Sequence, residues 1–375
     1  MRILFLTPYP AYPPHGGGVQ RMYQLIRQLS KRHEVWCLSL ASGPEAVAAA
    51  QPLAEWCHLT LAPAPRRSLA ERAASTLLSP LPDMALRAPI AGYRAALLNL
   101  LREVPFDVVQ AESIEMAAGA LLARRHGAWA ALDEWNAEYL LQRRAALTDL
   151  RAPRRAHAAL YSLIQWRKLA AYERSLSRRL DQIFVVSRED AAALRRLDAR
   201  RAPGEDFPVI PNGVDTAYFA PPQERAIDPD LLLFTGTLDF RPNIDALIWF
   251  VREVLPLIRR ERPGARLRIV GRSPAPAVLA LARPGVVEVT GAVPDVRPSF
   301  AEAAVYVLPM RMGGGVRLKL LEALAAETPL VSTAMGADGV EGLRHGEHCL
   351  LADAPAEFAQ AVLGLLRDRA EAARL

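Results

Sequence analysis

Three glycines followed by two cations and a carboxylate are the residues of this chain whose types and spacing could most directly do chemistry. They are Gly313, Gly314 and Gly315, then Val316, Arg317, Lys319 and Glu322. Glycines let the backbone approach a ligand closely, and the N–H groups at a helix start, together with full positive charges, favour an anion. The pattern predicts a site for a diphosphate-bearing ligand. Taken alone, it is equally typical of a surface loop whose cations are solvated.

The elements around this run have the strand, loop and helix order that a phosphate site requires. The β-like segment Ala304–Pro309 precedes the glycines, and we expect a helix over Val316–Ala326 after them. A second run, Gly16, Gly17 and Gly18, follows the first expected strand and also enters a helix. Its spacing differs from the Gly-x-Gly-x-x-Gly of dinucleotide folds, and no acidic residue closes the next strand. An NAD enzyme is therefore not expected.

Short apolar runs alternate with helical patterns along the chain, which predicts an α/β fold of doubly wound parallel sheets. The expected strands are Ile3–Leu6, Val35–Leu40, Val108–Ala111, Trp129–Leu132 and Ile183–Val186, then Leu231–Thr235, Leu267–Val270, Val286–Thr290, Val305–Leu308 and Pro329–Ser332. A helix is expected over Asn243–Arg262, and the Pro/Gly-rich segment Ala202–Pro222 is the expected linker. We therefore expect two Rossmann-like domains, residues 1–205 and 206–375, that face each other across a cleft.

The composition narrows the classes of protein. A hydrophobic content of 51% over 375 residues is enough for two buried cores. No apolar run approaches the roughly 18 residues that a membrane-spanning helix requires, and the first residues resemble a strand more than a signal peptide. The three cysteines, Cys37, Cys57 and Cys349, have neither disulfide nor zinc-ligand spacing. A cytoplasmic protein with no metal site is expected.

The net charge of +6 is concentrated in one segment. Residues 142–201 contain 15 Lys and Arg against 6 Asp and Glu, a balance of +9 that leaves −3 for the rest of the chain. Tyr161, Trp166 and Tyr172 lie among these cations, so the segment is compatible with an amphipathic helix on an anionic membrane. The alternative is an ordinary helix with a buried stripe, consisting of Leu160, Leu163, Ile164, Ala171 and Leu176. No recognised nucleic-acid-binding module accompanies the charge, so nucleic acid is not an expected partner.

Several segments together, in this order and spacing, resemble the glycosyltransferases of family 4. They are the first strand with its Pro/Gly loop, then Ile210-Pro211-Asn212-Gly213-Val214-Asp215, Phe234-Thr235-Gly236-Thr237-Leu238, Ile269-Val270-Gly271, Leu321-Glu322-Ala323-Leu324-Ala325 and Thr328-Pro329-Leu330-Val331-Ser332. The resemblance covers nearly the whole chain. It implies the GT-B fold and a retaining transfer of a hexose from a nucleotide-diphosphate sugar to an acceptor, without a metal cofactor.

The same resemblance implies roles for the residues of the donor site. Arg317 and Lys319 would stabilise the departing diphosphate, since no Asp-x-Asp motif lies where a metal could do so. Glu322 matches the second glutamate of the Glu-x7-Glu motif and would accept hydrogen bonds from the donor ribose hydroxyls. The expected donor-binding backbone is that of Gly16, Gly17, Gly18, Gly236, Gly313, Gly314, Gly315 and Val316.

Several positions depart from the family pattern. Gly314 stands where the first glutamate of the motif would fall, as in a subgroup with Gly-Gly-Gly-x-Arg-x-Lys. Thr237 and Pro242 stand where many members have an Arg and a Lys. We expect Arg317 and Lys319 to compensate for that missing pair of cations.

The first domain offers candidates for contact with the sugar or the acceptor. Glu112 follows a strand at a position where relatives often have a histidine. Asn136 and Glu138 lie in the segment where relatives frequently have a His-Asn pair. Each of these is equally typical of a solvated loop or a helix cap. His15 stands beside the first glycine run and is a further candidate, although a lone histidine is more often incidental.

The expected function is synthesis of a polysaccharide or glycoconjugate, with a glycan or lipid-linked acceptor and peripheral contact at the inner membrane face. The last helix of this fold usually returns to the first domain, whereas here the chain ends soon after an expected helix over Pro355–Arg369, so the crossover helix is expected to be short or missing. Weaker contact between the domains would follow. The alternatives are a non-catalytic scaffold that binds sugar nucleotides and an epimerase or phosphorylase on the same fold.

Overall fold

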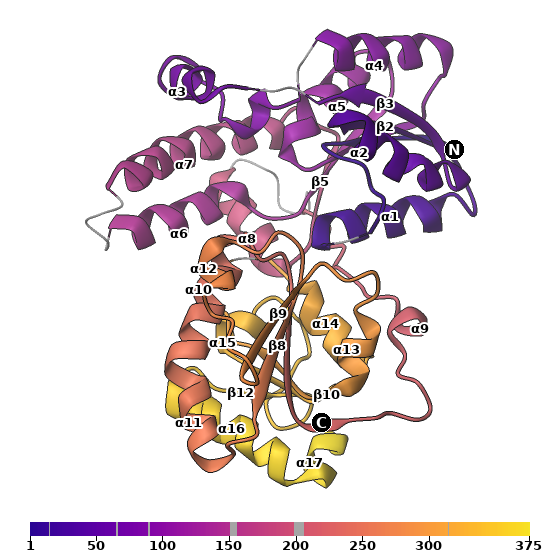
Figure 1. The fold of residues 1–375 in the computed structure, drawn as a ribbon. Coiled ribbons are helices and arrows are strands. Elements are labelled where there is room, and N and C mark those ends of the chain that lie inside the picture. The colour runs from indigo at the N-terminus through magenta and orange to yellow at the C-terminus, as the bar shows by residue number, and fades with distance from the viewer. Residues whose placement is uncertain (15, 65–66, 89–90, 151–155, 199–205, 314) are drawn as a thin grey trace. The chain divides into compact units, whose positions relative to one another are not determined.

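The structure, a computed structural model, describes the chain except for residues 15, 65–66, 89–90, 151–155, 199–205 and 314. It divides into two compact units, Met1–Pro211 (unit 1) and Asn212–Leu375 (unit 2). In Figure 1 the colours run from indigo to magenta through unit 1, and through orange to yellow in unit 2. The division falls inside the expected linker Ala202–Pro222, a few residues after the expected domain limit at residue 205.

Unit 1 contains a parallel sheet flanked by helices. Its strands are β1 (Arg2–Thr7), β2 (Glu34–Ala41), β3 (His58–Pro63), β4 (Val108–Glu112), β5 (Trp129–Glu134) and β6 (Gln182–Val185). Its helices are α1 (Gly17–Leu29), α2 (Gly43–Ala50), α3 (Leu69–Leu78), α4 (Ala91–Glu103), α5 (Ala117–Arg124), α6 (Glu138–Leu150), α7 (Ala156–Ser177) and α8 (Arg188–Leu197), with the 3-10 turns η1 (Gln51–Glu55), η2 (Met84–Leu86) and η3 (Ile114–Met116).

The strand order over the described part of unit 1 is β3-β2-β1-β4-β5-β6, and every neighbouring pair is parallel. Side chains alternate between the two faces: Ile3 and Phe5 pack in one buried cluster, Leu4 and Leu6 in another. Because both faces are covered, β1 is a nearly continuous apolar run. The order reverses between β1 and β4, which is where ligands bind in such sheets.

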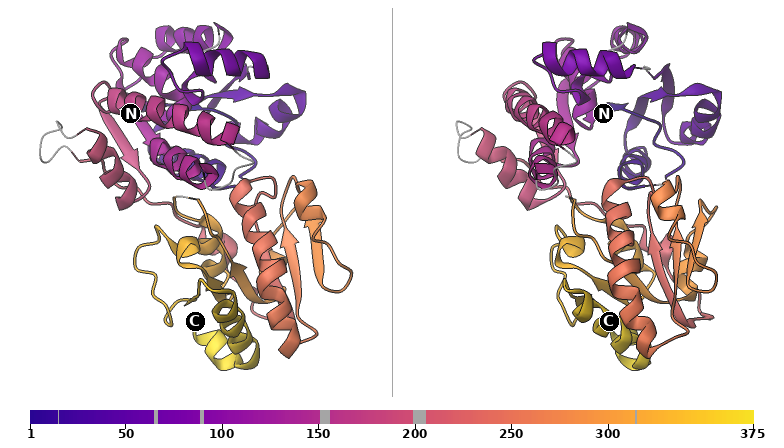
Figure 2. Two further views of the ribbon diagram at one scale, coloured as in Figure 1. Left: turned by 90° about the vertical axis from the view of Figure 1, so that its left-hand side faces the viewer. Right: turned by 60° about the vertical axis from the view of Figure 1, so that its left-hand side comes forward.

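Helices α6 and α7 form a long pair that lies side by side in both views of Figure 2. The inward face of α7 is mixed: Leu169, Tyr172 and Leu176 are buried, and so are the polar side chains of Gln165 and Glu173. The stripe expected from the sequence is buried only in part: Leu176 is buried, whereas Leu160 is 60% exposed. The choice of stripe counted apolar residues and overlooked polar ones that are buried beside them.

Unit 2 is a second α/β sandwich. Its strands are β7 (Asp228–Thr235), β8 (Arg266–Val270), β9 (Val287–Gly291), β10 (Ala303–Leu308), β11 (Leu330–Ser332) and β12 (Leu350–Leu351). Its helices are α9 (Thr216–Phe219), α10 (Arg241–Trp249), α11 (Leu255–Glu261), α12 (Pro276–Leu279), α13 (Arg297–Glu302), α14 (Leu318–Ala325), α15 (Ala334–Ala337), α16 (Pro355–Arg367) and α17 (Arg369–Arg374), and the π turn Phe250–Val254 joins α10 to α11.

The strand order over the described part of unit 2 is β12-β11-β10-β7-β8-β9, again entirely parallel. Numbered from its own first strand, this is the order of unit 1, with the reversal between β7 and β10. Strand β10 is buried along its whole length and forms the centre of the core. Helix α14 packs Leu320 and Ala323 inward, which leaves Lys319 and Glu322, three residues apart, on a common side of the helix.

The expected strands are all present, with limits that differ by a few residues at most. Two strands were not predicted, β3 and β12. Both lie at a sheet edge; β3 is mostly only partly buried and β12 is two residues long, so neither sequence has a strong apolar run.

Candidate functional site

The glycine-rich loop connects the buried end of β10 to α14. Gly313 and Gly315 have φ values of 127° and 69°, in the left-handed range that favours glycine, while Gly314 lies outside the described residues. A Cβ on Gly313 would lie 2.9 Å from Arg317 Nη2. The glycine therefore also gives room for the Arg317 side chain to fold back over the loop.

Arg317 is the N-cap residue that directly precedes α14, and its side chain is held against the loop backbone. Its Nη1 donates to the carbonyl of Gly315 and its Nη2 donates to that of Met335 at 3.4 Å. Val316 packs beside Gly339, where a Cβ would lie 3.3 Å from Val316 Cγ2. A full positive charge is thus fixed at the N-terminal end of a helix, where an anion is favoured.

Lys319 extends from the first turn of α14 toward the end of β7. Its Nζ donates to Asn243 Oδ1 at 2.8 Å and lies 4.2 Å from the ring centroid of Phe234. Burial and the charge of Arg317 lower the pKa of the Lys319 ammonium to about 7, and Glu322 opposes this shift. An anion bound here would restore the pKa, so the site favours a negatively charged ligand.

Asn243 was not predicted from the sequence, yet it positions Lys319. It is 4% exposed, and its Nδ2 donates to the carbonyl of Thr237 at 2.8 Å. A Cβ on Gly236 would lie 2.9 Å from Lys319 Nζ, so a side chain at this position would displace the ammonium. The sequence signal that could have identified it is an asparagine in the first turn of a helix that follows a strand and a glycine.

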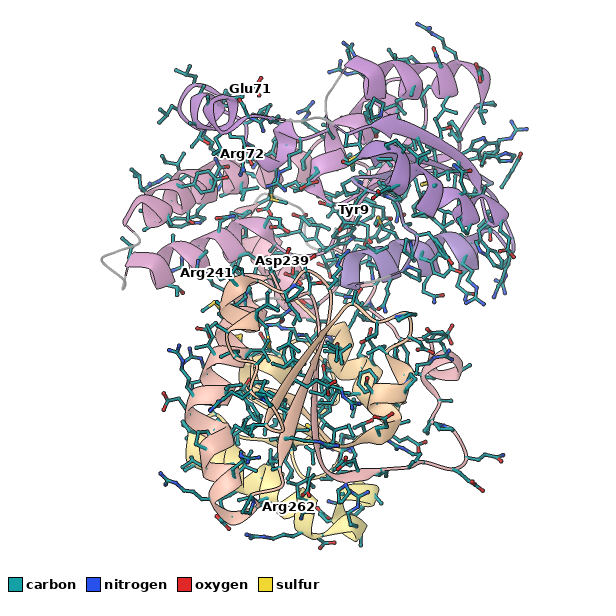
Figure 3. All side chains as sticks on the ribbon, in the orientation of Figure 1. Tyr9, Glu71, Arg72, Asp239, Arg241 and Arg262 are labelled. Atoms are coloured by element: carbon teal, nitrogen blue, oxygen red, sulfur yellow. The ribbon has the colours of Figure 1, made fainter. Side chains whose placement is uncertain are left out.

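The Lys319 ammonium lies at the end of β7, beside the turn that contains Thr237 and Pro242. These are the two positions where the family pattern has cations and this chain has none. Arg241, labelled in Figure 3, is a further cation at the start of α10 in the same turn. Lys319 and Arg241 therefore place positive charge at this edge of the sheet, although Thr237 and Pro242 carry none.

Glu322 follows Lys319 by about one turn of α14 and is partly buried. Burial raises the pKa of Tyr306, and the charge of Glu322 raises it further, while hydrogen bonds with Thr235 oppose the shift. The Tyr306 hydroxyl lies 2.8 Å from Thr235 Oγ1. Glu322 thus stands near the ends of β7 and β10. The structure brings the described donor-site candidates of unit 2, from Gly236 to Glu322, to one edge of the sheet.

The sequence Asp228-Pro229-Asp230 has Asp-x-Asp spacing but lies at the opposite end of β7. Asp228 pairs with Arg266, and Asp230 pairs with Arg262 at 2.5 Å. These carboxylates are engaged far along the strand from the glycine-rich loop. Over the described part of the chain, no three His, Cys, Asp or Glu side chains are grouped to hold a metal ion.

The first glycine run lies in unit 1, at the start of α1. Gly16 has φ 100°, and Gly17 is the first residue of the helix. A Cβ on Gly18 would lie 2.7 Å from the Trp135 ring and 3.0 Å from Tyr9 Oη, so this glycine is required by aromatic packing. The candidate His15 lies outside the described residues.

Glu112 is fully buried at the end of β4. Its Oε1 accepts from Gln110 Nε2 at 2.7 Å and its Oε2 from Trp135 Nε1 at 3.3 Å. Burial and the nearby Asp133 raise the pKa of Glu112 well above its ordinary value. Because Glu112 has no exposed surface, its contacts in the structure are with neighbouring side chains. Direct contact with a ligand stays a prediction.

A buried ion pair, which sequence reasoning missed, lies beside Glu112. Arg21 Nε and Nη2 donate to the two oxygens of Asp133 at 2.6 and 2.7 Å, and Arg21 Nη1 donates to the carbonyl of Ile210 at 2.9 Å. Both side chains are almost inaccessible. The pair joins α1, the end of β5 and the last residues of unit 1. A cation one turn into the helix after the glycines was the available signal.

Asn136 and Glu138 follow β5, where Asn136 Nδ2 lies 3.5 Å from Glu138 Oε1. Burial raises the pKa of Glu138 to about 7. These two predicted residues do lie together, at the same sheet edge as Glu112. A carboxylate with a pKa near neutrality can both accept and donate a proton.

The basic segment of residues 142–201 is less available than its composition implies. Arg144 pairs with Glu189 at 2.5 Å, Arg178 pairs with Asp198 at 2.7 Å, and Lys168 donates to carbonyls at the end of α3. Such pairs reduce the charge presented to an outside partner. Among the described residues, no helix is both long and apolar enough to cross a membrane.

Comparison with known families gives two matches. The family described as "Glycosyltransferase Family 4" matches residues 15–218, which is more than half of the chain. The family described as "Glycosyl transferases group 1" matches residues 229–368. The two matches follow the two units in order.

A curated relative is the "Uncharacterized 44.6 kDa protein in cps region" of Klebsiella pneumoniae. It is 27% identical over 140 residues, which are 35% of this chain and 36% of the relative. The chain thus matches about a third of the length of that protein.

Among the solved structures that resemble the whole chain, two illustrate the likeness. A structure of Anabaena Alr3699/HepE in complex with UDP and glucose has a TM-score of 0.67 and 13% identity, with 100% of this chain and 92% of that chain covered. The S. aureus protein TarM has a TM-score of 0.71 and 9% identity, with 100% and 93% covered. At such identities the likeness concerns the fold, and this fold is GT-B. With its family model spanning more than half of the residues, the chain belongs to glycosyltransferase family 4.

Proposed function

We propose that this protein is a retaining hexosyltransferase that moves a sugar from a nucleotide-diphosphate sugar to a glycan or lipid-linked acceptor, in the synthesis of a polysaccharide or glycoconjugate. Membership of the family supports glycosyl transfer. UDP and glucose in the Anabaena structure support a nucleotide sugar as donor, and the relative from a cps region supports a polysaccharide product.

The observation that carries the proposal is the pair of cations at the start of α14. A nucleotide-diphosphate sugar loses its sugar as the bond to the phosphate oxygen breaks, so negative charge grows on the diphosphate. Fixed charges at that position lower the barrier more than mobile ones do. Arg317, held by loop carbonyls, and Lys319, held by Asn243, are fixed cations of this kind.

Lys319 takes over the role of the cations that are missing after β7. Its Nζ reaches the position next to Gly236, beside the turn that holds Thr237 and Pro242. In this proposal the diphosphate lies between the N–H groups of the glycine-rich loop and these two cations, with no metal ion, and Glu322 accepts hydrogen bonds from the donor ribose.

The acceptor binds in unit 1 in this proposal. Asn136 and Glu138 are the partly buried polar groups at the ligand-binding edge of its sheet, and Glu138 has a pKa suited to proton exchange with a hydroxyl. Peripheral contact with an anionic membrane is part of the proposal. Because Arg144 and Arg178 pair with carboxylates of unit 1, the structure supports membrane contact less strongly than the charge of the sequence does.

The first experiment is a calorimetric titration of the protein with UDP, GDP and ADP, each with and without EDTA. We expect one diphosphate to bind at micromolar concentration with no effect of EDTA. The corresponding nucleotide sugar is then supplied with candidate acceptors, and NMR of the new linkage reports whether its anomeric configuration is retained. Absence of binding by all three nucleotides would contradict the proposal, and tight binding without any transfer would favour a non-catalytic scaffold.

A further inference from the structure

Unit 1 contains a charged pocket that none of the roles above uses. It has a volume of about 290 Å³ and is lined by three arginines, Arg67, Arg72 and Arg87, and two carboxylates, Asp83 and Glu115. This volume is at the lower end for ligand pockets, which suits one small charged group better than a whole oligosaccharide.

A single buried carboxylate holds the three arginines together. Asp83, whose side chain is 3% exposed, accepts from Arg67 Nη1 at 2.9 Å, and its other oxygen lies 3.4 Å from both Arg72 Nη2 and Arg87 Nη2. The backbone N–H of Asp83 donates to the buried Gln165 of α7 at 2.9 Å, which fixes the loop. The guanidinium groups are therefore arranged before any ligand arrives.

The pocket has a surplus of positive charge and of hydrogen-bond donors. Three arginines against two carboxylates leave one net positive charge. Glu115 accepts from Arg87 Nη1 at 2.6 Å, whereas the bonds from Arg72 and Arg87 to Asp83 are long. The side chains of Arg72 and Arg87 are 43% and 46% exposed, so their planar groups, each with five N–H donors, are accessible to a ligand.

The position of the pocket is that of a ligand site. Pro8 and Ala64 directly follow β1 and β3, and Glu115 lies just after β4, so the pocket opens at the carboxyl end of the sheet. Figure 3 labels Arg72 below α3, a helix that packs against α7. Glu112, Asn136 and Glu138 lie at the same sheet edge.

We propose that this pocket binds a phosphate or diphosphate group of the acceptor substrate, an inference that rests on the proposed function. Arginine forks match the geometry of phosphate oxygens, and several of them neutralise the multiple charges of a phosphate. A carboxylate, with one charge and two oxygens, needs one arginine. The phosphate comes either from a lipid-linked diphosphate or from a phosphorylated glycan, and both present the same group to the pocket.

The test is a calorimetric titration of the protein, saturated with UDP, with inorganic pyrophosphate, since UDP blocks the donor site. We expect saturable binding that the double variant R72Q/R87Q weakens by about tenfold or more, as expected when hydrogen bonds to a charged group are lost. The control R124Q removes an exposed arginine that pairs with Asp181 outside the pocket, and it should leave binding unchanged.

The variant Glu115→Gln provides a change of opposite sign. It removes a negative charge and releases Arg87, so pyrophosphate should bind on the order of two- to fivefold more tightly. A loss of folding cannot produce this result. Geranyl diphosphate in detergent and glucose 1-phosphate are then compared as competitors, and the stronger one assigns the source of the phosphate.

Normal UDP binding, with no pyrophosphate binding or with binding that R72Q/R87Q leaves unchanged, would overturn this inference while the proposed function stands. Failure of UDP itself to bind would instead count against the proposed function. Tighter binding in E115Q together with weaker binding in R72Q/R87Q would establish the pocket as an anion site.

Discussion

The two units share one strand order but place opposite chemistry at equivalent positions. In unit 1 the fourth strand of the sheet, β4, ends at the buried carboxyl group of Glu112. In unit 2 the corresponding strand, β10, leads into the glycine-rich loop with Arg317 and Lys319. The same backbone arrangement thus presents carboxyl groups in one unit and cations in the other.

This difference shows where specificity resides in such a fold. The sheets supply the same ligand-binding edge, and the charge at that edge depends on a few side chains in the following loops. In both units a buried side chain also holds a nearby cation in place, Asp133 for Arg21 and Asn243 for Lys319.

The largest effect is expected from the double variant R317A/K319A. In the proposed donor site each cation forms charge-assisted contacts with the diphosphate, so their joint loss should weaken nucleotide binding by about a hundredfold or more. Calorimetry with the preferred nucleoside diphosphate measures this change. Normal affinity in the double variant would refute the assignment of the donor site to α14.

Arg311→Ala is the matched control for that variant. Arg311 lies in the same loop but pairs with Asp245, at 2.7 Å, and stands over Trp249. Its removal lowers the loop charge by one without touching the proposed diphosphate position. We expect a less than threefold change in affinity, since screened surface charges contribute up to about 1 kcal/mol.

Unit 1 should depend on its buried ion pair for stability. Arg21→Met leaves the carboxylate of Asp133 buried without its bidentate partner, which typically costs about 3–5 kcal/mol. Urea denaturation should therefore show an earlier unfolding transition. The double variant R21M/D133N removes the stranded charge as well and should recover part of the loss; no recovery would mean that Arg21 stabilises the unit through contacts other than its pair with Asp133, such as those to the carbonyls of Ile210 and Pro211.

The sequence was a good guide to the sheets because buried parallel strands are continuous apolar runs. Phe5 and Leu6 lie on opposite faces and are both buried, so β1 was recognisable without any knowledge of its neighbours. The edge strand β3 was missed because its residues are only partly buried and its pattern is weak. Strand prediction therefore succeeded for the buried strands, and at the sheet edges for β6 and β9, whose sequences still contain short apolar runs.

The site was only partly predictable, for a different reason. Gly313, Arg317 and Lys319 lie within seven consecutive residues, so a local sequence pattern was enough to predict a site there. Asn243 is 76 residues from Lys319 in the chain, and Asp133 is 112 residues from Arg21. Only the fold brings these partners together, and their residue types alone are those of ordinary helix and strand ends.

A pH effect on stability is expected from the buried carboxyl groups of unit 1. Glu134 and Glu173 are each about 1% exposed. Burial and the neighbouring Glu173 raise the pKa of Glu134, and burial, with the charge of Glu138, raises the pKa of Glu173 to about 8. Among the described residues, no N–H donor satisfies the oxygens of Glu134, whose hydrogen-bonding neighbour is the carboxyl group of Glu173. The protonated form is therefore the one that the fold favours.

The pKa of Glu173 in the folded state lies above the unfolded value of 4.5. The stabilisation that its protonated carboxyl group gives is therefore complete below about pH 4.5 and is lost as the pH rises toward about 8. Urea denaturation across this window should show a falling free energy of unfolding, with a slope of up to about 1.4 kcal/mol per pH unit for one group. Glu173→Gln should flatten the slope, and Glu357→Gln, on α16 of unit 2, should not. An unchanged slope in E173Q would place the titrating group elsewhere.

The smallest effect concerns the pH dependence of donor binding in unit 2. The free Lys319 ammonium has a pKa of about 7, and a bound diphosphate raises it, because an adjacent negative charge favours the protonated form. Binding above pH 7 must therefore take up a proton, and affinity should fall by at most about tenfold per pH unit. The preferred nucleotide sugar is the suitable probe, since its diphosphate is esterified at both ends and does not titrate near neutrality. Calorimetry from pH 6 to 9 measures the slope, and K319M should bind more weakly but with a flat profile. A K319M variant that keeps the wild-type slope would show that the titrating cation of the donor site is not Lys319, and the contrast between the two units would then rest on Arg317 alone.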